Sequence, residues 1–413
     1  MAKAGGPESG AETVEEPPDG GDIDDVPPKK AKRQVSRTAL MIGAGMAVAV
    51  IAAIWGSFHF IESERQREIQ QWQVRLGIVA DSRTAAVGEW IEQNFSYMRE
   101  LSENASLQLY MSELADGGEE IGLDDKDKNS TEQVDAEEEA ASASYLRNLL
   151  IATAERTGFK APPPVGEVSA NVERPGIAGI GLVDKEGKSL VGTPDMPPLT
   201  AKIRTAVAKA LDGEPAVIDV YIGASGLPTM GFVLPIFGIQ QDSDGAKGIG
   251  AAVGVRTIGK DLYDRLKQPG EIAETTETYM VRAREAVVEY LTPLADGTSP
   301  LKRTMSADTP DLAGAHALKK PGGFAINSDY AGDEVLAASR SVAGVPWVLI
   351  RKISRKEALS ATDTRLNTML VVFILLIVGI TVTIVAVWRH GSSVRATQAA
   401  ANMKVALERF ENL

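Results

Sequence analysis

The sequence contains no cysteine and only three histidines. Without cysteine the chain can form no disulfide and no thiolate metal site, so its stability must come from core packing. His316 is its single histidine between residues 61 and 368, and no HExxH pattern, nucleophile elbow or phosphate-binding loop is present. We therefore expect no catalytic residues, no metal site and no cofactor, and a protein that is not an enzyme.

Charge is absent from two long stretches of the chain. Residues 39–60 and 369–388 contain no Asp, Glu, Lys or Arg. About 20 apolar residues suffice for a helix to cross the hydrocarbon core of a membrane. The alternative, a buried core helix, is disfavoured because soluble helices seldom stay uncharged over this length. The sequence therefore predicts two transmembrane helices.

Basic residues beside these runs predict the orientation of the chain. Before the first run stand Lys29, Lys30, Lys32, Arg33 and Arg37, and after the second stand Arg389 and Arg395. Short flanks rich in Lys and Arg stay in the cytoplasm. We expect a two-span protein of the inner membrane, with cytoplasmic termini and residues 61–368 periplasmic or extracellular. A net charge of −13 argues against a nucleic-acid partner.

Composition and periodicity divide the rest of the chain. Residues 1–38 predict a disordered cytoplasmic tail, since they are rich in Pro, Gly and charge. Residues 61–112 lack proline and repeat apolar side chains every three or four positions, which predicts a long extracytoplasmic spine helix. The acidic stretch 113–143 predicts a flexible insertion. Residues 389–413 predict a cytoplasmic helix.

One pattern in the acidic stretch is close to a calcium loop. Asp125, Asp127 and Asn129 have the spacing of its first three ligands. Ser130 then stands where glycine is needed, and Ala136 stands where the bidentate Glu should be. We therefore interpret the stretch as a solvated charge run.

Two series of β-prone segments follow, each in the order β-β-α-β-β-β. The first lies within residues 113–268, with strands at 176–183, 188–192, 216–223, 229–239 and 246–255 and a helix at 199–213. The second lies within 269–368, with strands at 278–283, 286–292, 322–329, 334–342 and 347–353 and a helix at 307–318. Turn-forming residues separate the strands. The predicted fold class is α+β, with two transmembrane helices flanking a long spine helix and two antiparallel-sheet modules.

This organisation resembles the double Cache sensor domain of bacterial transmembrane receptors. The similarity is carried by GIAGIGLVDKEGKSLVGTP at the first hairpin, by VYIGASGLPTMGFVLPIFG and GAKGIGAAVGVRTIGKDL in the next strands, and by GVPWVLIRKISRKEAL at the exit. It implies two PAS-like modules, a homodimer and a small-molecule ligand, which is usually bound in the membrane-distal module.

The amino-acid-binding members of that family carry a Tyr, Arg, Trp-Tyr and Ala pattern that this chain matches only in part. Arg204 and Ala210 match, whereas Ala206 and Val207 replace the Trp-Tyr pair. The acidic partners for an amine are also missing, because Gly223 stands where Asp is expected. A standard amino-acid ligand is therefore disfavoured, and a carboxylate that pairs with Arg204 is the better candidate.

Several residues of the distal module are candidate ligand contacts. They are Arg204, Asp219, Tyr221, Tyr145, Met230 and Phe232. A solvated helix arginine is the alternative for Arg204, and a solvated strand face is the alternative for Asp219 and Tyr221. Met230 and Phe232 suit a packed core better than a pocket.

The sequence therefore predicts a transmembrane sensor subunit that passes a ligand signal through its two spans. Residues 389–413 are too few for a kinase, cyclase or chemotaxis domain, so the output would lie in further sequence or in a partner of one of those classes. The competing hypothesis is a membrane-anchored scaffold of the cell envelope that senses no ligand.

Overall fold

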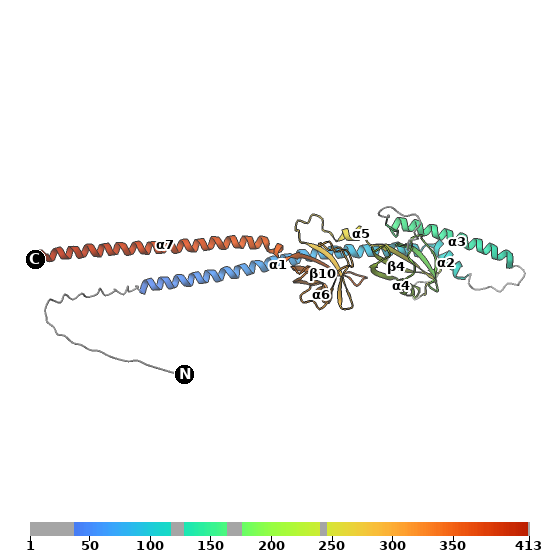
Figure 1. Cartoon of the computed structure of the whole chain (residues 1–413), viewed down its shortest axis with the longest axis horizontal. Coiled ribbons are helices and arrows are strands. Elements are labelled where there is room, and N and C mark those ends of the chain that lie inside the picture. Colours follow the sequence, from blue (N-terminus) through green and yellow to red (C-terminus); the bar gives the residue numbers. More distant parts are fainter. Residues whose placement is uncertain (1–36, 117–127, 163–175, 240–245, 412–413) are drawn as a thin grey trace, which may run out of the picture. The chain divides into compact units, whose positions relative to one another are not determined.

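The structure is a computed structural model that describes residues 37–116, 128–162, 176–239 and 246–411 (Figure 1). Nearly all of the predicted tail 1–38 lies outside the described residues, as do Asp125 and Asp127 of the calcium-like pattern. Residues up to Ser57 and residues from Phe58 onward form separate compact units. Both sheets belong to the second unit.

Four long helices come from the proline-poor segments. They are α1 (Arg37–Ser102), α2 (Ala105–Asp116), α3 (Lys128–Thr157) and α7 (Arg355–Glu411). α1 ends earlier than the predicted spine helix, because Asn104 starts a new helix: its Oδ1 accepts a hydrogen bond from the Leu107 N–H at 3.0 Å. α3 covers residues 128–143 of the segment predicted to be flexible. Its many Glu and Ala residues are good helix formers.

The first sheet has five antiparallel strands in the order β2-β1-β5-β4-β3. Its elements are β1 (Gly179–Asp184), β2 (Ser189–Gly192), α4 (Ala201–Leu211), β3 (Ala216–Ile222), β4 (Pro228–Ile236) and β5 (Gly250–Thr257). β3 is an edge strand, and its register with β4 shifts between Ile218 and Tyr221. Such a bulge changes which side chains share a face of the sheet.

The second sheet repeats this topology with one extra strand. After the short helices α5 (Lys260–Tyr263) and η1 (Asp264–Leu266) come β6 (Glu277–Arg284), β7 (Val287–Tyr290), β8 (Thr304–Ser306), α6 (Ala313–Lys319), β9 (Phe324–Ser328), β10 (Glu334–Ser341) and β11 (Val348–Ser354). The strand order is β8-β7-β6-β11-β10-β9. Without β8 it reproduces the order of the first sheet. The predicted pair of β-β-α-β-β-β modules is thus confirmed, whereas β8 was missed and the helix predicted at 307–318 begins only at Ala313.

Each sheet packs one face on α1 and the other face on its own short helix (Figure 1). Side chains of α1 from Ile69 to Leu101 form one continuous core with strands of both modules. At Gly254 on β5 a Cβ would lie 2.5 Å from the Met98 sulfur and 2.7 Å from the Phe159 ring. Glycine therefore allows α1 and the segment after α3 to approach the first sheet closely.

Among the described residues, one helix is long and apolar enough to cross a membrane. It is the Arg355–Val387 part of α7, with a mean hydropathy of 3.2 in its most apolar window. The start of α7 is attached to α1: Trp72 Nε1 donates to the Ala358 carbonyl at 3.0 Å, and Arg65 and Asp363 form an ion pair at 2.8 Å. The helix that leaves the second sheet is thus held against α1.

Candidate functional site

The predicted ligand contacts do not gather around any one of the cavities that the described residues form. Arg204 is exposed on α4, and the buried face of that helix is formed by Ile203, Ala206, Val207 and Ala210. These small side chains pack directly on the first sheet, where the resemblance places the Trp-Tyr pair. The structure therefore favours the solvated interpretation of Arg204.

Met230 and Phe232 are fully buried on β4, in the core beneath α1. The Phe232 ring makes edge contacts with Phe95, Phe159 and Trp90, at centroid distances of 5.1, 6.1 and 6.4 Å. Edge-to-face aromatic packing of this kind stabilises a core. These two residues hold α1 on the sheet, in agreement with the core interpretation.

Tyr145 lies elsewhere, on α3. Its side chain is 42% exposed, and its ring lies 5.1 Å from that of Tyr110 on α2. The pair connects two helices at their surface. Nothing in this arrangement brings Tyr145 near Arg204 or Tyr221, which lie on the other face of the first sheet.

Asp219 connects the two modules. Its Oδ1 accepts a hydrogen bond from the Trp347 indole N–H at 2.8 Å, and its Oδ2 pairs with Arg282 of β6 at 2.7 Å. The Arg282 guanidinium also donates to the carbonyl of Val220 at 2.8 Å. We predicted that the Asp219 carboxylate is either solvated or in contact with a ligand. Instead it is bonded to Trp347 and Arg282 of the second module.

Tyr221 is the one predicted contact that lines a described cavity, which we call the junction cavity. This space of about 530 Å³ lies between the modules. The first module contributes the start of α4 and the end of β3, with residues Thr200, Ala201, Lys202, Tyr221, Ile222, Gly223 and Ala224. The second contributes Arg282, Arg284, Glu289 and Leu301. A molecule in this cavity would contact both modules at once.

The junction cavity carries a surplus of positive charge. Three cationic side chains, Lys202, Arg282 and Arg284, stand against the carboxylates of Glu289 and Asp219. Glu289 is almost fully buried and accepts from Arg282 at 2.6 Å and from Arg284 at 3.2 Å. The N-terminal end of α4 adds a partial positive charge.

Three side chains, Lys202, Tyr221 and Arg284, complete the chemistry of the junction cavity. The Lys202 ammonium lies 5.4 Å from the centre of the Tyr221 ring. Burial raises the pKa of Tyr221, so its hydroxyl stays protonated and able to donate. Arg284 is 61% exposed at the opening. The arrangement offers donors and positive charge to a small anion.

Sequence reasoning missed the half of this cavity that comes from the second module. Arg282 and Arg284 alternate at the end of β6, directly after the apolar Met280 and Val281. The available signal was that β6 changes from apolar residues to basic residues at alternate positions. Within the described ranges no group of three His, Cys, Asp or Glu side chains could hold a metal ion.

Comparisons with known proteins found similar solved structures that share little sequence identity with this chain. No family model and no curated protein matches the chain. The sensor domain of the V. cholerae histidine kinase DctB is similar over 70% of this chain and 98% of its own, with 10% identity and a TM-score of 0.40. The ligand-binding domain of Mlp24, solved with asparagine, covers 73% of this chain and 99% of its own (13% identity, TM-score 0.41).

A third similar structure is the ligand-binding domain of the Pseudomonas aeruginosa PAO1 amino acid chemoreceptor PctC, in complex with GABA. It covers 68% of this chain and 99% of its own, with 15% identity and a TM-score of 0.37. These neighbours are of the class that the double Cache resemblance implied.

Proposed function

We propose that the chain is a transmembrane sensor subunit of the double Cache type, which binds a small anion in the junction cavity. One observation carries the proposal: the cavity is built from both modules, so a ligand there bears on their arrangement. A ligand shifts a conformational equilibrium only if it binds the two states with different affinity. A cavity whose walls belong to two modules meets this condition, since its shape depends on how they pack.

The ligand class follows from the lining. Lys202 and Arg284 place positive charge at the opening. Arg282 lies further inside, and its guanidinium is already paired with Asp219 and Glu289. A carboxylate accepts hydrogen bonds from such groups with favourable charge. An amine would have only Glu289 as a partner within the lining, and that carboxylate is already bonded by two arginines. A small carboxylate therefore suits the cavity better than an amine.

The membrane arrangement is part of the same proposal. α7 crosses the membrane within residues 369–388, and α1 crosses it within 39–60, where Met41 and Trp55 are more than 70% exposed. Both termini then lie in the cytoplasm and residues 61–368 lie outside it. The sensor acts as a homodimer and passes its signal along α7 to a kinase, cyclase or chemotaxis partner, or to a domain of that kind in further sequence.

The proposal can be tested by calorimetric titration of the full chain in nanodiscs. Acetate, malonate, succinate and phosphate are titrated at constant ionic strength, with methylamine as the cationic control. Lys202→Ala should weaken carboxylate binding about three- to tenfold, since one partly exposed charge is worth about 1 kcal/mol. Lys209→Ala is the matched control, because Lys209 lies exposed on the same helix and outside the junction cavity.

Two results would count against this assignment. Equal losses in both lysine variants would mean that binding depends on overall charge and not on the junction cavity. If every anion gives heat changes indistinguishable from those of buffer, the chain binds none of them, and the scaffold hypothesis is favoured.

A further inference from the structure

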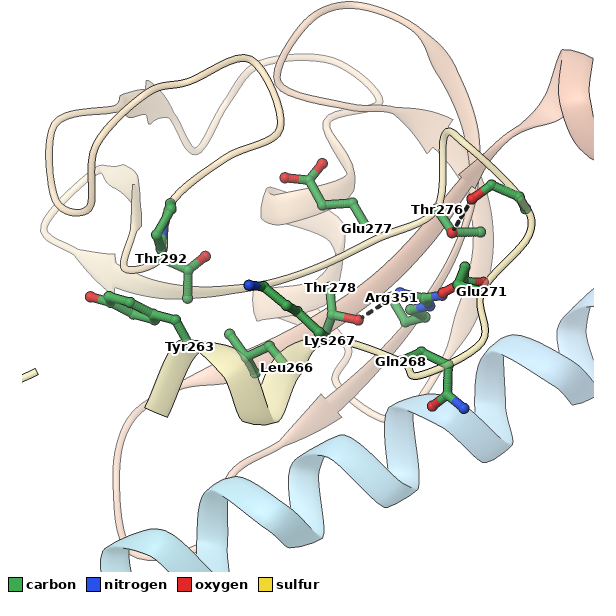
Figure 2. Close-up of a pocket in the computed structure, with 12 residues that line it drawn as sticks. Tyr263, Leu266, Lys267, Gln268, Glu271, Thr276, Glu277, Thr278, Thr292 and Arg351 are labelled. Carbon is green, nitrogen blue, oxygen red and sulfur yellow. Dashed lines mark hydrogen bonds and ion pairs between the residues drawn. The ribbon is translucent and has the colours of Figure 1, made fainter. Parts of the chain in front are cut away.

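A second cavity lies at the linker between the two modules, and we call it the linker cavity. Its volume is about 340 Å³, and its walls are η1, residues 267–276 and the adjoining parts of β6 and β11 (Figure 2). The lining includes Lys267, Glu271, Thr278 and Arg351. Figure 2 shows Glu271 reaching from the linker to the guanidinium of Arg351.

Arg351 is the unusual residue of this cavity. Its side chain is only 4% exposed, on the face of β11 that also carries the buried Leu349 and Ile353 toward α1. It pairs with Glu271 and donates to the Thr278 hydroxyl at 2.9 Å. Burial, and after it the charge of Arg83, lower the pKa of Arg351 to about 10. The guanidinium is therefore still charged at neutral pH.

The Arg351 Nε has no acceptor among the residues that the structure describes. The same holds for the Nε of Arg83 on α1, whose charge acts on Arg351. A buried donor without an acceptor is costly. Glu277 lines the cavity, but its oxygens already accept from the Ala295 N–H and the Tyr330 hydroxyl. The Arg351 Nε thus lacks an acceptor, and a small anion would supply one.

Glu271 occupies the place that such an anion would take. It is a linker residue with 27% of its side chain exposed, next to Gly270 in the left-handed region (φ 74°). The other end of the linker is attached to α7: the N–H groups of Glu274 and Thr275 both donate to the Glu357 carboxylate at 2.8 Å. The linker is therefore held at Arg351 by its own carboxylate, Glu271, and at α7 by the carboxylate of Glu357.

We propose that the linker cavity is a second ligand site, where a small carboxylate replaces Glu271 on Arg351 and releases this part of the linker from β11. Glu271 is the internal competitor for this site. Its release leaves the linker attached only near its ends, where the Lys267 carbonyl accepts from Arg83 of α1 and Thr275 bonds to Glu357 of α7 and Ser354 of β11. Occupancy of the cavity therefore changes how the second module holds the proposed membrane helix. The ligand needs one carboxylate and few other atoms, because the space is small and the arginine fork donates to two oxygens.

The test is acetate binding to the full chain in nanodiscs, measured by calorimetry at constant ionic strength. Glu271→Gln removes the competing charge and keeps the size of the side chain, so acetate should bind at least about tenfold more tightly than to the wild type. Glu274→Gln is the matched control on the same linker, and it should bind as the wild type does. Arg351→Lys keeps a charge without the fork and should abolish the gain when combined with Glu271→Gln.

Hydrogen exchange of the linker amides gives the second readout. Acetate should speed exchange at residues 270–273 in the wild type, whereas Glu271→Gln should show fast exchange with or without it. Unchanged acetate affinity in Glu271→Gln would overturn the proposal, even if the Arg351 variant failed to fold. Lys202→Ala distinguishes the two sites, because it should weaken binding at the junction cavity and leave the gain caused by Glu271→Gln intact.

Discussion

At the scale of single residues, Asp219 joins the two modules through a hydrogen bond from Trp347 and an ion pair with Arg282. Trp347 and Arg282, which bind it, lie 128 and 63 positions further along the chain. Alternation on a strand indicates which face a side chain takes, but not which module covers that face. The bulge after Ile218 also interrupts the alternation of side chains along β3, on which the expected face of Asp219 was based.

The contact predicts a graded effect of two substitutions at Asp219. Asp219→Ala should destabilise the protein by about 1–3 kcal/mol, because the buried Trp347 indole N–H loses its acceptor. Asp219→Asn keeps an acceptor and should lose less. Urea unfolding of the full chain in detergent measures both. An equal loss in the two variants would mean that the hydrogen bond to Trp347 contributes little.

Phe232 gives a second prediction at this scale. Phe232→Ala should cost about 3–5 kcal/mol, because it removes a fully buried ring that touches Trp90, Phe95 and Phe159. Tyr145→Ala, at a 42% exposed position, is the aromatic control and should cost far less. Thermal unfolding compares them. A small effect of Phe232→Ala would contradict its place in the core.

At the scale of secondary structure, the periodic elements were predictable and the breaks between them were not. All five strands of the first module were predicted within a few residues, because apolar runs and turn residues alternate clearly there. The end of α1 at Ser102 was missed, since apolar spacing continues past it and only the capping geometry of Asn104 stops the helix. β8, three residues long, has no pattern of its own.

The packing of α1 on the first sheet predicts that Gly254 cannot be enlarged. Gly254→Ala would place a methyl group 2.5 Å from the Met98 sulfur, so helix and sheet must separate locally. We expect a loss of about 1–3 kcal/mol in the free energy of unfolding. Gly323→Ala is the control, because its nearest neighbour lies at an ordinary 3.4 Å. Similar unfolding midpoints for both variants would show that α1 packs less closely than described.

At the scale of the whole molecule, the repeated module was predicted from element order, but the cavities were not. Both cavities use residues from distant segments: Lys202 with Arg284 at the junction, and Glu271 with Arg351 at the linker. A single sequence contains no signal that joins such pairs. The predicted site was placed inside the distal module, where the buried face of α4 packs on the first sheet.

The central claim is that a small anion in the junction cavity changes the arrangement of the two modules. The chain has no cysteine, so Lys209→Cys on α4 and Lys319→Cys on α6 create the only two sites for spin labels. Pulsed dipolar spectroscopy of the full chain in nanodiscs then measures the distance between them with and without malonate. We predict a shifted distance distribution, which Lys202→Ala reduces at the same malonate concentration. An unchanged distribution when calorimetry shows malonate bound would contradict the claim.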